Sequence, residues 1–336
     1  MSTLLVTGCA GFIGMHAAQR LLARGDTVVG IDNLNTYYDP ALKTARLARL
    51  QAHPGFRFEK LDVADRAAMA DLFARVRPQR VLHLAAQAGV RYSIDQPDDY
   101  TDSNLLGFAN VLQGCRAQQV AHLVFASSSS VYGGNARLPY REQDAVDHPI
   151  SYYAATKKAN EVMAHSYAHL YGLPCTGLRF FTVYGPWGRP DMALFKFTRA
   201  MLAGQAIDVY GHGQLVRDFT YIDDIVTGVL RVLDKPATPD ATHDPLAPHP
   251  GSSSAPYRIF NIGNSTPTVL MDYITALEAA LGLTARKNML PQQPGDVHST
   301  AADTRALQAW VGFAPDTSVR EGVARFVQWY QEFYAS

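Results

Sequence analysis

The chain has 336 residues, a length that suits about two domains of ordinary size. Its 30 lysines and arginines balance its 30 aspartates and glutamates, and only 18% of its residues are charged. So little charge excludes the global basic field that attracts nucleic acid or an anionic membrane surface. A hydrophobic share of 47% also excludes a disordered or collagen-like polypeptide.

The sequence has no leader-like start and no stretch that predicts a membrane span. Residues 1–16 lack a basic segment followed by an uninterrupted apolar run, and no window reaches the roughly 18 apolar residues that cross a bilayer. Cys9, Cys115 and Cys175 are far apart, and no C-x-x-C pair occurs. We therefore expect a soluble cytoplasmic protein with reduced thiols, no metal site, no membrane contact and no nucleic-acid partner.

Short apolar runs alternate with longer amphipathic stretches over the first half of the chain. The runs predict strands at Leu4–Thr7, Thr27–Ile31, Phe56–Val63, Val81–Ala85, Leu123–Ser127 and Thr176–Phe180. The stretches between them predict helices that include Met15–Arg24, Arg66–Val76 and Asn104–Gln118. Strands that are apolar on both faces and alternate with helices predict a doubly wound, Rossmann-type α/β fold with a parallel sheet.

This alternation changes after Phe181. A segment rich in Gly and Pro precedes a predicted helix at Leu194–Ala203, and residues 208–222 are typical of β-structure. Residues 236–256 are rich in Pro, Ser and Asp and have no periodicity, so we expect a long surface loop. A further strand is predicted at residues 258–263, and the last two predicted helices are Leu270–Leu281 and Ser318–Tyr334.

A glycine-rich turn, TGCAGFIG, follows the first predicted strand at residues 7–14. Gly8 and Gly11 allow a tight turn close to a pyrophosphate, and Gly14 allows the next helix to pack closely on the strand. The N-terminus of that helix offers N–H donors to phosphate. The turn therefore predicts a dinucleotide site, with contacts from Gly8, Gly11, Phe12, Ile13 and Gly14.

Asp32 ends the second predicted strand, at the distance from the glycine turn that dinucleotide-binding folds use. Its carboxylate can accept hydrogen bonds from an adenosine ribose and would repel the 2′-phosphate of NADP, so NAD is favoured over NADP. A simple capping role in the loop is the alternative. Asp62 and Val63, at the end of the third predicted strand, fit an adenine contact. The fourth strand ends in small residues that let the backbone pass close to a cofactor, so we expect contacts from Leu84, Ala85 and Ala86.

Tyr153 and Lys157 are four residues apart at the start of a predicted helix, so they share one face. A neighbouring ammonium and a positive nicotinamide ring would lower the pKa of the Tyr153 phenol toward the range of a useful base. Four serines, 127–130, end the fifth strand at the ligand-binding edge of the sheet. We select Ser128 as the hydroxyl that shares a substrate hydrogen bond with Tyr153.

These motifs together resemble the extended short-chain dehydrogenase/reductase superfamily, and within it the nucleotide-sugar epimerases and dehydratases. Residues 32–47, 85–93, 153–161 and 179–193 are similar to the UDP-glucuronate 4-epimerases. The resemblance covers nearly the whole chain. It implies that tightly held NAD takes a hydride from C4 of the sugar of UDP-glucuronate, and that the 4-keto sugar takes it back on its other face to give UDP-galacturonate.

The resemblance also assigns residues. It implies a catalytic triad of Ser128, Tyr153 and Lys157, with Asn104 as a structural residue behind it. Arg217 corresponds to an arginine that meets the nucleotide diphosphate, and Asp296 lies in a stretch that touches the nucleoside. It implies a homodimer that pairs through helices at 104–118 and 156–170. We expect an NAD-binding domain of residues 1–180 with 218–264, interleaved with a smaller nucleotide-sugar-binding α/β domain of residues 181–217 with 265–336.

The neighbouring reactions are distinguished by a few positions. Ser129 and Ser130 stand where dehydratases carry a carboxylate pair and where UDP-glucuronate decarboxylases carry a glutamate, which disfavours both. Thr182 and Arg189 are placed to hold a sugar carboxylate, with Ser129 or Ser130 adding hydrogen bonds and with Arg91 as an alternative to Arg189. A UDP-glucose or UDP-N-acetylhexosamine 4-epimerase remains open, as does a non-catalytic NAD-sensing regulator.

Overall fold

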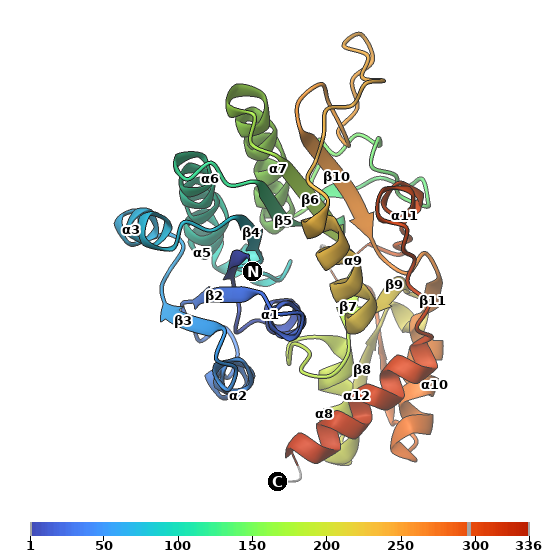
Figure 1. Ribbon diagram of the computed structural model, residues 1–336. Helices are drawn as coiled ribbons and strands as arrows, with labels where there is room; N and C mark the ends of the chain where they lie inside the picture. Colours follow the sequence, from blue (N-terminus) through green and yellow to red (C-terminus); the bar gives the residue numbers. More distant parts are fainter. Residues whose placement is uncertain (1, 294–296, 335–336) are drawn as a thin grey trace.

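A seven-stranded parallel sheet forms the centre of the molecule (Figure 1). The computed structural model describes residues 2–293 and 297–334. The strand order is β10-β6-β5-β4-β1-β2-β3, and the direction of strand addition reverses between β1 and β4, where folds of this kind bind dinucleotides. The strands are β1 (Thr3–Thr7), β2 (Thr27–Asp32), β3 (Phe56–Lys60), β4 (Arg80–His83), β5 (His122–Ser128), β6 (Cys175–Phe180) and β10 (Tyr257–Ile262).

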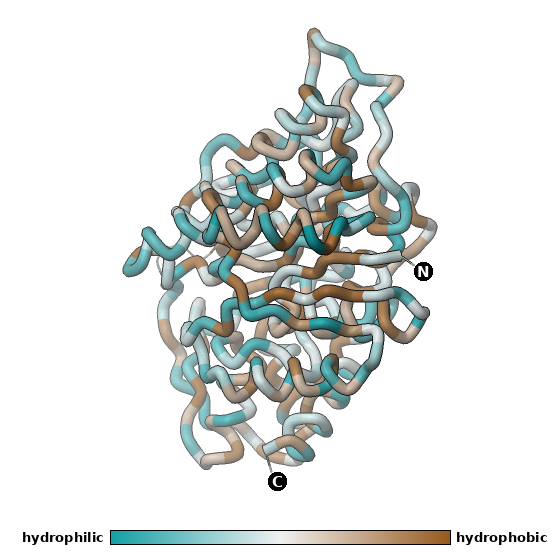
Figure 2. The backbone as a smooth tube through the Cα atoms, turned by 60° about the vertical axis from the view of Figure 1, so that its left-hand side comes forward, coloured by the Kyte–Doolittle hydropathy of each residue, from teal (hydrophilic) through white to brown (hydrophobic). Residues whose placement is uncertain are grey.

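Helices cover both faces of this sheet (Figure 1). Alternate residues of one strand belong to different hydrophobic clusters: Leu4 and Val6 pack with one group of helices, and Leu5 packs with the other. The helices on the first side are α1 (Phe12–Ala23), α2 (Pro40–Gln51) and α9 (Ile222–Asp234). Those on the second side are α3 (Arg66–Val76), α6 (Gly107–Ala117) and α7 (Tyr152–Tyr171). The predicted doubly wound fold is thus confirmed, and Figure 2 shows its apolar strands enclosed by more polar helices and loops.

Two small sheets lie beside the large one, in the lower part of Figure 1. One has the strand order β11-β9-β7, and the other pairs β12 with β8. Their strands are β7 (Thr182–Tyr184), β8 (Ile207–Tyr210), β9 (Val216–Tyr221), β11 (Pro267–Val269) and β12 (Lys287–Leu290). The accompanying helices are α8 (Ala193–Leu202), α10 (Leu270–Leu281), α11 (Arg305–Val311) and α12 (Val319–Tyr334). The proposed domain boundary at residue 218 falls inside β9.

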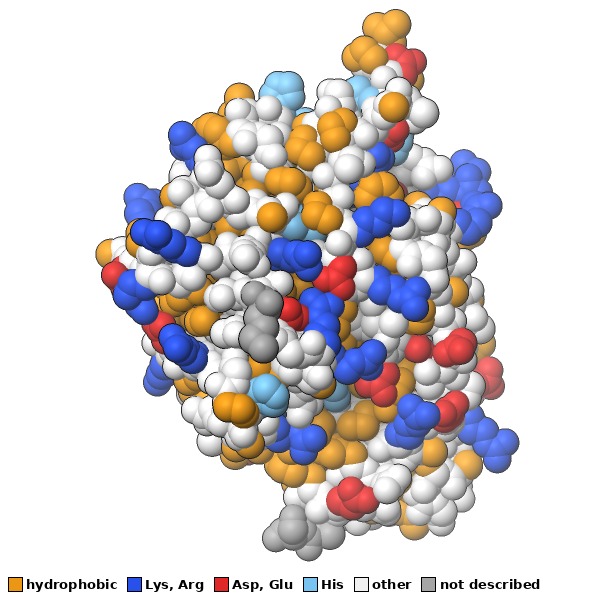
Figure 3. Space-filling view, in the orientation of Figure 1, with side chains coloured by type: hydrophobic (Ala, Val, Ile, Leu, Met, Phe, Trp, Pro, Cys, Tyr) orange, Lys and Arg blue, Asp and Glu red, His pale blue; other side chains and the backbone are white. Residues whose placement is uncertain are grey.

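Short elements connect the larger ones. They are α4 (Tyr92–Asp95), α5 (Pro97–Tyr100), the π-helical turn η1 (Thr101–Leu106), and the 3-10 turns η2 (Ser129–Tyr132) and η3 (Gly211–Gly213). Between α9 and β10 the chain forms the loop at the top of Figure 1. In the described part of the chain, no helix has both the length and the apolar character that a bilayer span requires. Basic and acidic side chains are interspersed on the face drawn in Figure 3.

The strand and helix predictions differ from the structure mainly at their ends. The helix predicted over 104–118 begins as the π-helical turn η1. Helix α7 begins one turn before the segment 156–170 that was predicted to pair in a dimer. Helix α2 was not predicted at all. Its signals are local ones: Asp39 accepts a hydrogen bond from the Ala41 N–H as N-cap, and Pro40 occupies the first turn.

Buried histidines make this fold sensitive to acid. His122 is fully buried at the start of β5, with Nδ1 3.1 Å from the Leu233 carbonyl oxygen and Nε2 2.9 Å from the Thr176 hydroxyl. The carbonyl can only accept, so Nδ1 carries the proton and Nε2 accepts from Thr176. Burial lowers the pKa of His122 to about 4. His16 and His83 are shifted in the same direction, to about 4 and about 3.

Each of these histidines stays neutral in the folded state while the unfolded chain takes up a proton below about pH 6.5. Stability is therefore present above that pH and is lost as the pH falls toward the folded pKa. We expect His122 alone to account for a loss of about 2 kcal/mol in the free energy of unfolding between pH 7 and pH 5. Urea unfolding at both pH values measures the total loss, to which His16 and His83 also contribute.

The variant His122→Asn should show a smaller loss between the two pH values, whatever its absolute stability. The exposed His148 supplies the control, because His148→Asn should leave the wild-type pH dependence unchanged. Equal pH dependence in wild type and His122→Asn would contradict the assignment.

Candidate active site

The turn between β1 and α1 leaves no room for a side chain at its glycine positions. A β-carbon on Gly8 would lie 2.7 Å from the Ala85 nitrogen, and one on Gly14 would lie 2.1 Å from the Gly8 carbonyl oxygen. Gly8 also has a φ of +71°, which favours glycine. Gly11 is the N-cap of α1 and provides no side-chain cap. The backbone N–H groups available to a phosphate at this helix start are those of Phe12, Ile13 and Gly14.

Asp32 ends β2 beside this turn and is buried. Its two carboxylate oxygens accept hydrogen bonds from the backbone N–H groups of Leu34, at 2.9 Å, and Ala10, at 3.2 Å. Burial raises the pKa of Asp32 above its ordinary value. These hydrogen bonds and the charge of Lys43 oppose the increase but do not cancel it. A carboxylate fixed in this way next to a phosphate-binding turn fits the ribose hydroxyls of NAD.

The residues predicted to meet the adenine lie at the next strand. Asp62 accepts hydrogen bonds from the Asn33 amide, at 2.8 Å, and from the Ala64 N–H, at 2.9 Å. Val63 is buried, and a β-carbon on Gly107 would lie 2.6 Å from its side chain. Asp62 therefore links the connections after β2 and β3, which together form one side of the expected adenine site.

The segment after β4 is tied to the glycine turn by Thr7. The Thr7 hydroxyl accepts from the backbone N–H groups of Leu84 and Ala85, at 3.2 and 3.1 Å, and lies 2.8 Å from Nδ1 of His83. Because burial keeps His83 neutral, its Nδ1 can accept the Thr7 proton. Leu84, Ala85 and the following Ala86 are thereby held under the glycine turn.

The predicted catalytic residues come from the end of β5 and the start of α7. A hydrogen bond from Ser128 and the charge of Arg189 lower the pKa of Tyr153, but burial outweighs them and raises it. Lys157 is buried, and its ammonium donates to the Ala126 carbonyl oxygen at 3.0 Å. Burial lowers the pKa of Lys157 to about 8.

The structure thus brings Ser128, Tyr153 and Lys157 to one place, as predicted. The lowering of the Tyr153 pKa was predicted with a positive nicotinamide ring beside the phenol. In the protein alone, the cost of burying a phenolate outweighs the polar neighbours and the pKa is raised.

Asn104 lies behind this group, as the resemblance implied. Its side chain accepts from the Gln87 N–H at 2.9 Å and donates to the Gln87 carbonyl and to the Thr156 hydroxyl, both at 3.0 Å. Asn160 in turn donates to the Asn104 carbonyl at 2.7 Å. These bonds fix α7 against the segment after β4 and so set the position of the helix that carries Tyr153.

Arg189 is near enough to Tyr153 for its charge to act on the phenol. It lies in the connection between β7 and α8 and forms a bidentate ion pair with Asp191, with contacts of 3.1 and 2.5 Å. Burial alone would lower the pKa of Arg189, but the neighbouring Asp191 carboxylate outweighs burial and raises it. Thr182, at the start of β7, is half-buried.

Ser129 and Ser130 form the turn η2 directly after Ser128. The Ser128 hydroxyl accepts from the Ser130 N–H at 3.1 Å. This bond fixes the hydroxyl oxygen of Ser128 and leaves the turn that follows β5 close to Tyr153.

The remaining predicted substrate residues come from different parts of the chain. Arg217, on β9, donates to the carbonyl oxygens of Val216, at 2.9 Å, and His298, at 3.0 Å. The Arg91 guanidinium lies over the ring of Tyr210, 5.3 Å from its centroid. Asp296 lies outside the described residues.

The structure adds two residues that the sequence analysis did not select. Arg46, on α2, is fully buried and donates to the carbonyl oxygens of Ala10, Trp187 and Gly188, at distances from 2.6 to 3.2 Å. Tyr37 donates to Asp191 at 3.2 Å. The segment that holds both was quoted only for its resemblance, and no local pattern indicates such distant partners.

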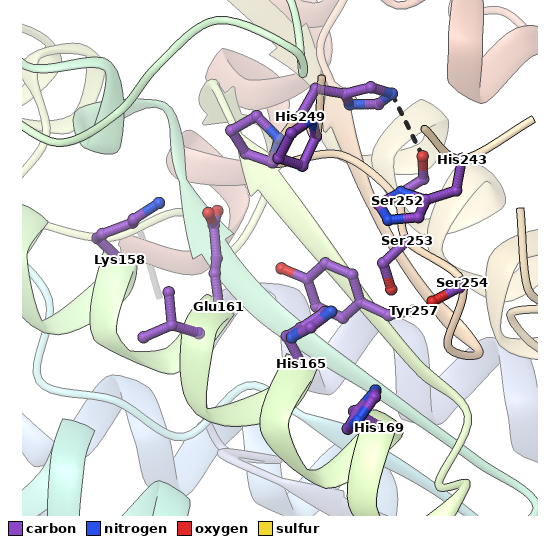
Figure 4. Close-up of a pocket in the computed structure, with 13 residues that line it drawn as sticks. Lys158, Glu161, His165, His169, His243, His249, Ser252, Ser253, Ser254 and Tyr257 are labelled. Atoms are coloured by element: carbon purple, nitrogen blue, oxygen red, sulfur yellow. Dashed lines mark hydrogen bonds between the residues drawn. The ribbon is translucent and has the colours of Figure 1, made fainter. Parts of the chain in front are cut away.

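A separate cavity of about 380 Å³ lies between α7, β10 and the loop before β10 (Figure 4). It is lined by His165 and His169 of α7, by His243 and His249 of the loop, and by Tyr257. None of the residues selected for cofactor or substrate lines it. Within residues 2–293 and 297–334, no three or more His, Cys, Asp or Glu side chains are arranged to hold a metal ion.

Comparison with known proteins places this geometry in a family. Residues 4–263 match the NAD dependent epimerase/dehydratase family. The chain is 49% identical to a probable UDP-glucuronate 4-epimerase of Rhizobium meliloti, over 98% of this chain and 97% of that protein.

Solved structures agree with this match. A UDP-glucuronic acid 4-epimerase from Bacillus cereus, in complex with UDP-glucuronic acid and NAD, superposes with a TM-score of 0.87 at 31% identity. The match covers 99% of this chain and 100% of that one. A UDP-glucose 4-epimerase from Thermotoga maritima, with UDP-glucose, gives 0.86 at 29% identity, with 99% of each chain covered.

Proposed function

The chain belongs to the NAD-dependent epimerase/dehydratase family, and from that premise we propose that it interconverts UDP-glucuronate and UDP-galacturonate by inverting C4. The observation that carries the proposal is the position of Arg189. This guanidinium acts electrostatically on Tyr153, so a cation suited to a carboxylate stands beside the residue suited to act at a sugar hydroxyl. Two of the three relatives described above are named for the same substrate, and the third is a UDP-glucose 4-epimerase.

NAD is held by the glycine turn and by the ends of β2, β3 and β4. The N–H groups at the start of α1 bind its pyrophosphate, Asp32 its ribose, and Asp62 and Val63 its adenine. When bound, NAD supplies a hydride acceptor for C4 of the sugar and returns that hydride. Asp32 excludes the 2′-phosphate of NADP by like charge.

Tyr153 moves the proton. Its phenolate takes the proton from the sugar 4-hydroxyl at Oη and gives it back after the 4-keto sugar has turned over. The Ser128 hydroxyl forms a hydrogen bond with the oxygen of the same sugar 4-hydroxyl. Lys157, with a pKa of about 8, remains mainly protonated at pH 7. We assign its ammonium to the stabilisation of the phenolate.

Arg189 restrains the carboxylate. A 4-keto glucuronate is a β-keto acid. It loses carbon dioxide when the C5–C6 bond to its carboxylate aligns with the carbonyl π system. Charge-assisted hydrogen bonds from Arg189, with the hydroxyls of Thr182, Ser129 and Ser130, hold the carboxylate out of that alignment.

The nucleotide lies against the smaller sheets. We assign Arg217 to the diphosphate and Asp296 to the nucleoside, and we retain the division into an NAD-binding domain (1–180 with 218–264) and a sugar-nucleotide domain (181–217 with 265–336). Holding the nucleotide while the sugar turns lets one site present both faces of C4.

A second substrate has one specific observation in its favour. Arg189 is already paired with Asp191, so its charge is compensated without an acidic sugar. A neutral hexose, as in UDP-glucose or a UDP-N-acetylhexosamine, would therefore not leave an unpaired cation.

Replacing Tyr153 by Phe should lower kcat by about two to four powers of ten, the usual contribution of a positioned acid/base. The NAD content of the purified protein should stay unchanged. Tyr152→Phe is the matched control, because Tyr152 is exposed and its hydroxyl bonds Thr101 at 2.7 Å instead. Near wild-type turnover in Tyr153→Phe would assign the proton transfer to another group.

Replacing Arg189 by Ala should cost about 2 to 4 kcal/mol in kcat/KM for UDP-glucuronate, as for a lost charge-assisted contact. The effect on UDP-glucose should be much smaller, and a decarboxylated UDP-4-keto-pentose should appear in the mass spectrum. Arg91→Ala is the control. If it gives this pattern and Arg189→Ala does not, the carboxylate site moves to Arg91.

We also propose a cytoplasmic homodimer. Three free, buried cysteines suit a reducing compartment. The outer face of α7 exposes Val162 and Leu170, whose exposed fractions are 52% and 65%. Pairing through this helix and residues 104–118 would bury both. Light scattering at micromolar concentration should give twice the chain mass, and Leu170→Glu should reduce it. A monomeric mass for the wild type would refute the dimer.

A further inference from the structure

Arg189 is held by residues from two distant parts of the chain. Asp191 binds two of its nitrogen atoms, Nε at 3.1 Å and an Nη at 2.5 Å. Tyr37, in the connection between β2 and α2, donates its hydroxyl hydrogen to the same carboxylate at 3.2 Å. Asp191 therefore accepts from both Arg189 and Tyr37, and each fixes it from a different side.

The position of Tyr37 is itself fixed. Its ring packs on Tyr92 with 4.8 Å between centroids, and Tyr100 lies between Tyr92 and the catalytic Tyr153, at 6.2 and 6.0 Å. A β-carbon on Gly89 would lie 2.6 Å from the Tyr37 hydroxyl, so only a glycine leaves space there. Burial and Asp191 raise the pKa of Tyr37 to about 12, so its hydroxyl remains a donor at neutral pH.

We propose that Tyr37 and Asp191 are positioning residues that fix the orientation of Arg189 toward an acidic sugar and thereby suppress decarboxylation. The inference rests on the proposed function. A guanidinium has five N–H donors, and Asp191 occupies two of them, so donors remain for the substrate carboxylate. Asp191 also limits rotation of the guanidinium plane, which a single flexible side chain would otherwise sample.

The suppressed side reaction has a defined balance. In the 4-keto sugar, the C5–C6 bond breaks, the C6 carboxylate leaves as carbon dioxide, and the electron pair passes into an enolate over C5, C4 and the carbonyl oxygen. A proton from solvent then adds at C5, which gives a UDP-4-keto-pentose. A guanidinium free to rotate allows the C5–C6 bond to align with the carbonyl π system, and this product should then form.

The test compares Asp191→Asn and Tyr37→Phe with Tyr92→Phe. Tyr92 is the matched control because it stacks on Tyr37 while its hydroxyl donates to Asp99, away from Arg189. With UDP-glucuronate, we expect kcat/KM to fall about tenfold in Asp191→Asn and about threefold in Tyr37→Phe, as for lost hydrogen bonds. The ratio of decarboxylated to epimerised product should rise in both. Tyr92→Phe should match the wild type, and kcat/KM for UDP-glucose should change by less than about twofold in all three.

A double-mutant cycle separates positioning from general disruption. If Asp191 acts through Arg189, Asp191→Asn should have no further effect on kcat/KM or product ratio in the Arg189→Ala background. An additive effect there, or equal losses with both nucleotide sugars, would overturn the inference, as would a wild-type product ratio in Asp191→Asn. The proposed function fails in a different way: the wild type would then not epimerise UDP-glucuronate at all, and the inference would fall with it.

Discussion

The buried guanidinium of Arg46 joins the two halves of the site. It binds the carbonyl oxygen of Ala10, 36 residues before it, and that of Trp187, 141 residues after it. A fully buried cation needs all of its donors satisfied, and here three carbonyl oxygens and the Tyr38 hydroxyl accept from them. The glycine turn that approaches the dinucleotide and the loop that carries Arg189 are therefore held at a fixed separation. Hydride transfer between cofactor and sugar requires such a separation.

Burial acts on both titratable side chains of the site. It raises the pKa of Tyr153 and lowers that of Lys157, so it works against a phenolate and against an ammonium. Each shift is one that an opposite charge nearby would offset. A positive charge beside Tyr153 would therefore favour the phenolate that the proposed reaction requires.

The sequence was informative where function depends on local backbone or on spacing along one element. The glycine turn, the strand-end carboxylate Asp32 and the Tyr153–Lys157 pair on one helix face belong to that class, and so does the alternation that predicted the doubly wound sheet. Ser128 needed its position at a strand end and its distance from Tyr153. Each of these features could be predicted because neighbouring residues within one short segment encode it, through a periodic pattern or a turn.

The partners of Arg189 could not be found in this way. Tyr37 and Asp191 are 154 residues apart, and neither stands in a pattern that specifies the other. The same holds for Arg46 and the carbonyl oxygens it binds, since backbone acceptors leave no trace in the sequence. Even the helix that carries Arg46 was missed, although Asp39 and Pro40 mark its start. Side chains that position others are selected by tertiary contact, and only the folded chain reveals them.

In the reaction proposed above, Arg189 must serve two stages, with and without the acidic sugar, and its pairing with Asp191 bears on both. An arginine that contacted only the substrate would be an uncompensated cation between turnovers. It would also bind an acidic sugar too tightly for the sugar to rotate. Under this proposal, the Asp191 carboxylate compensates the charge in both stages and weakens the attraction between Arg189 and the sugar acid without removing it. The proposal requires this balance, because the sugar acid must stay out of alignment with the carbonyl and must still be able to rotate.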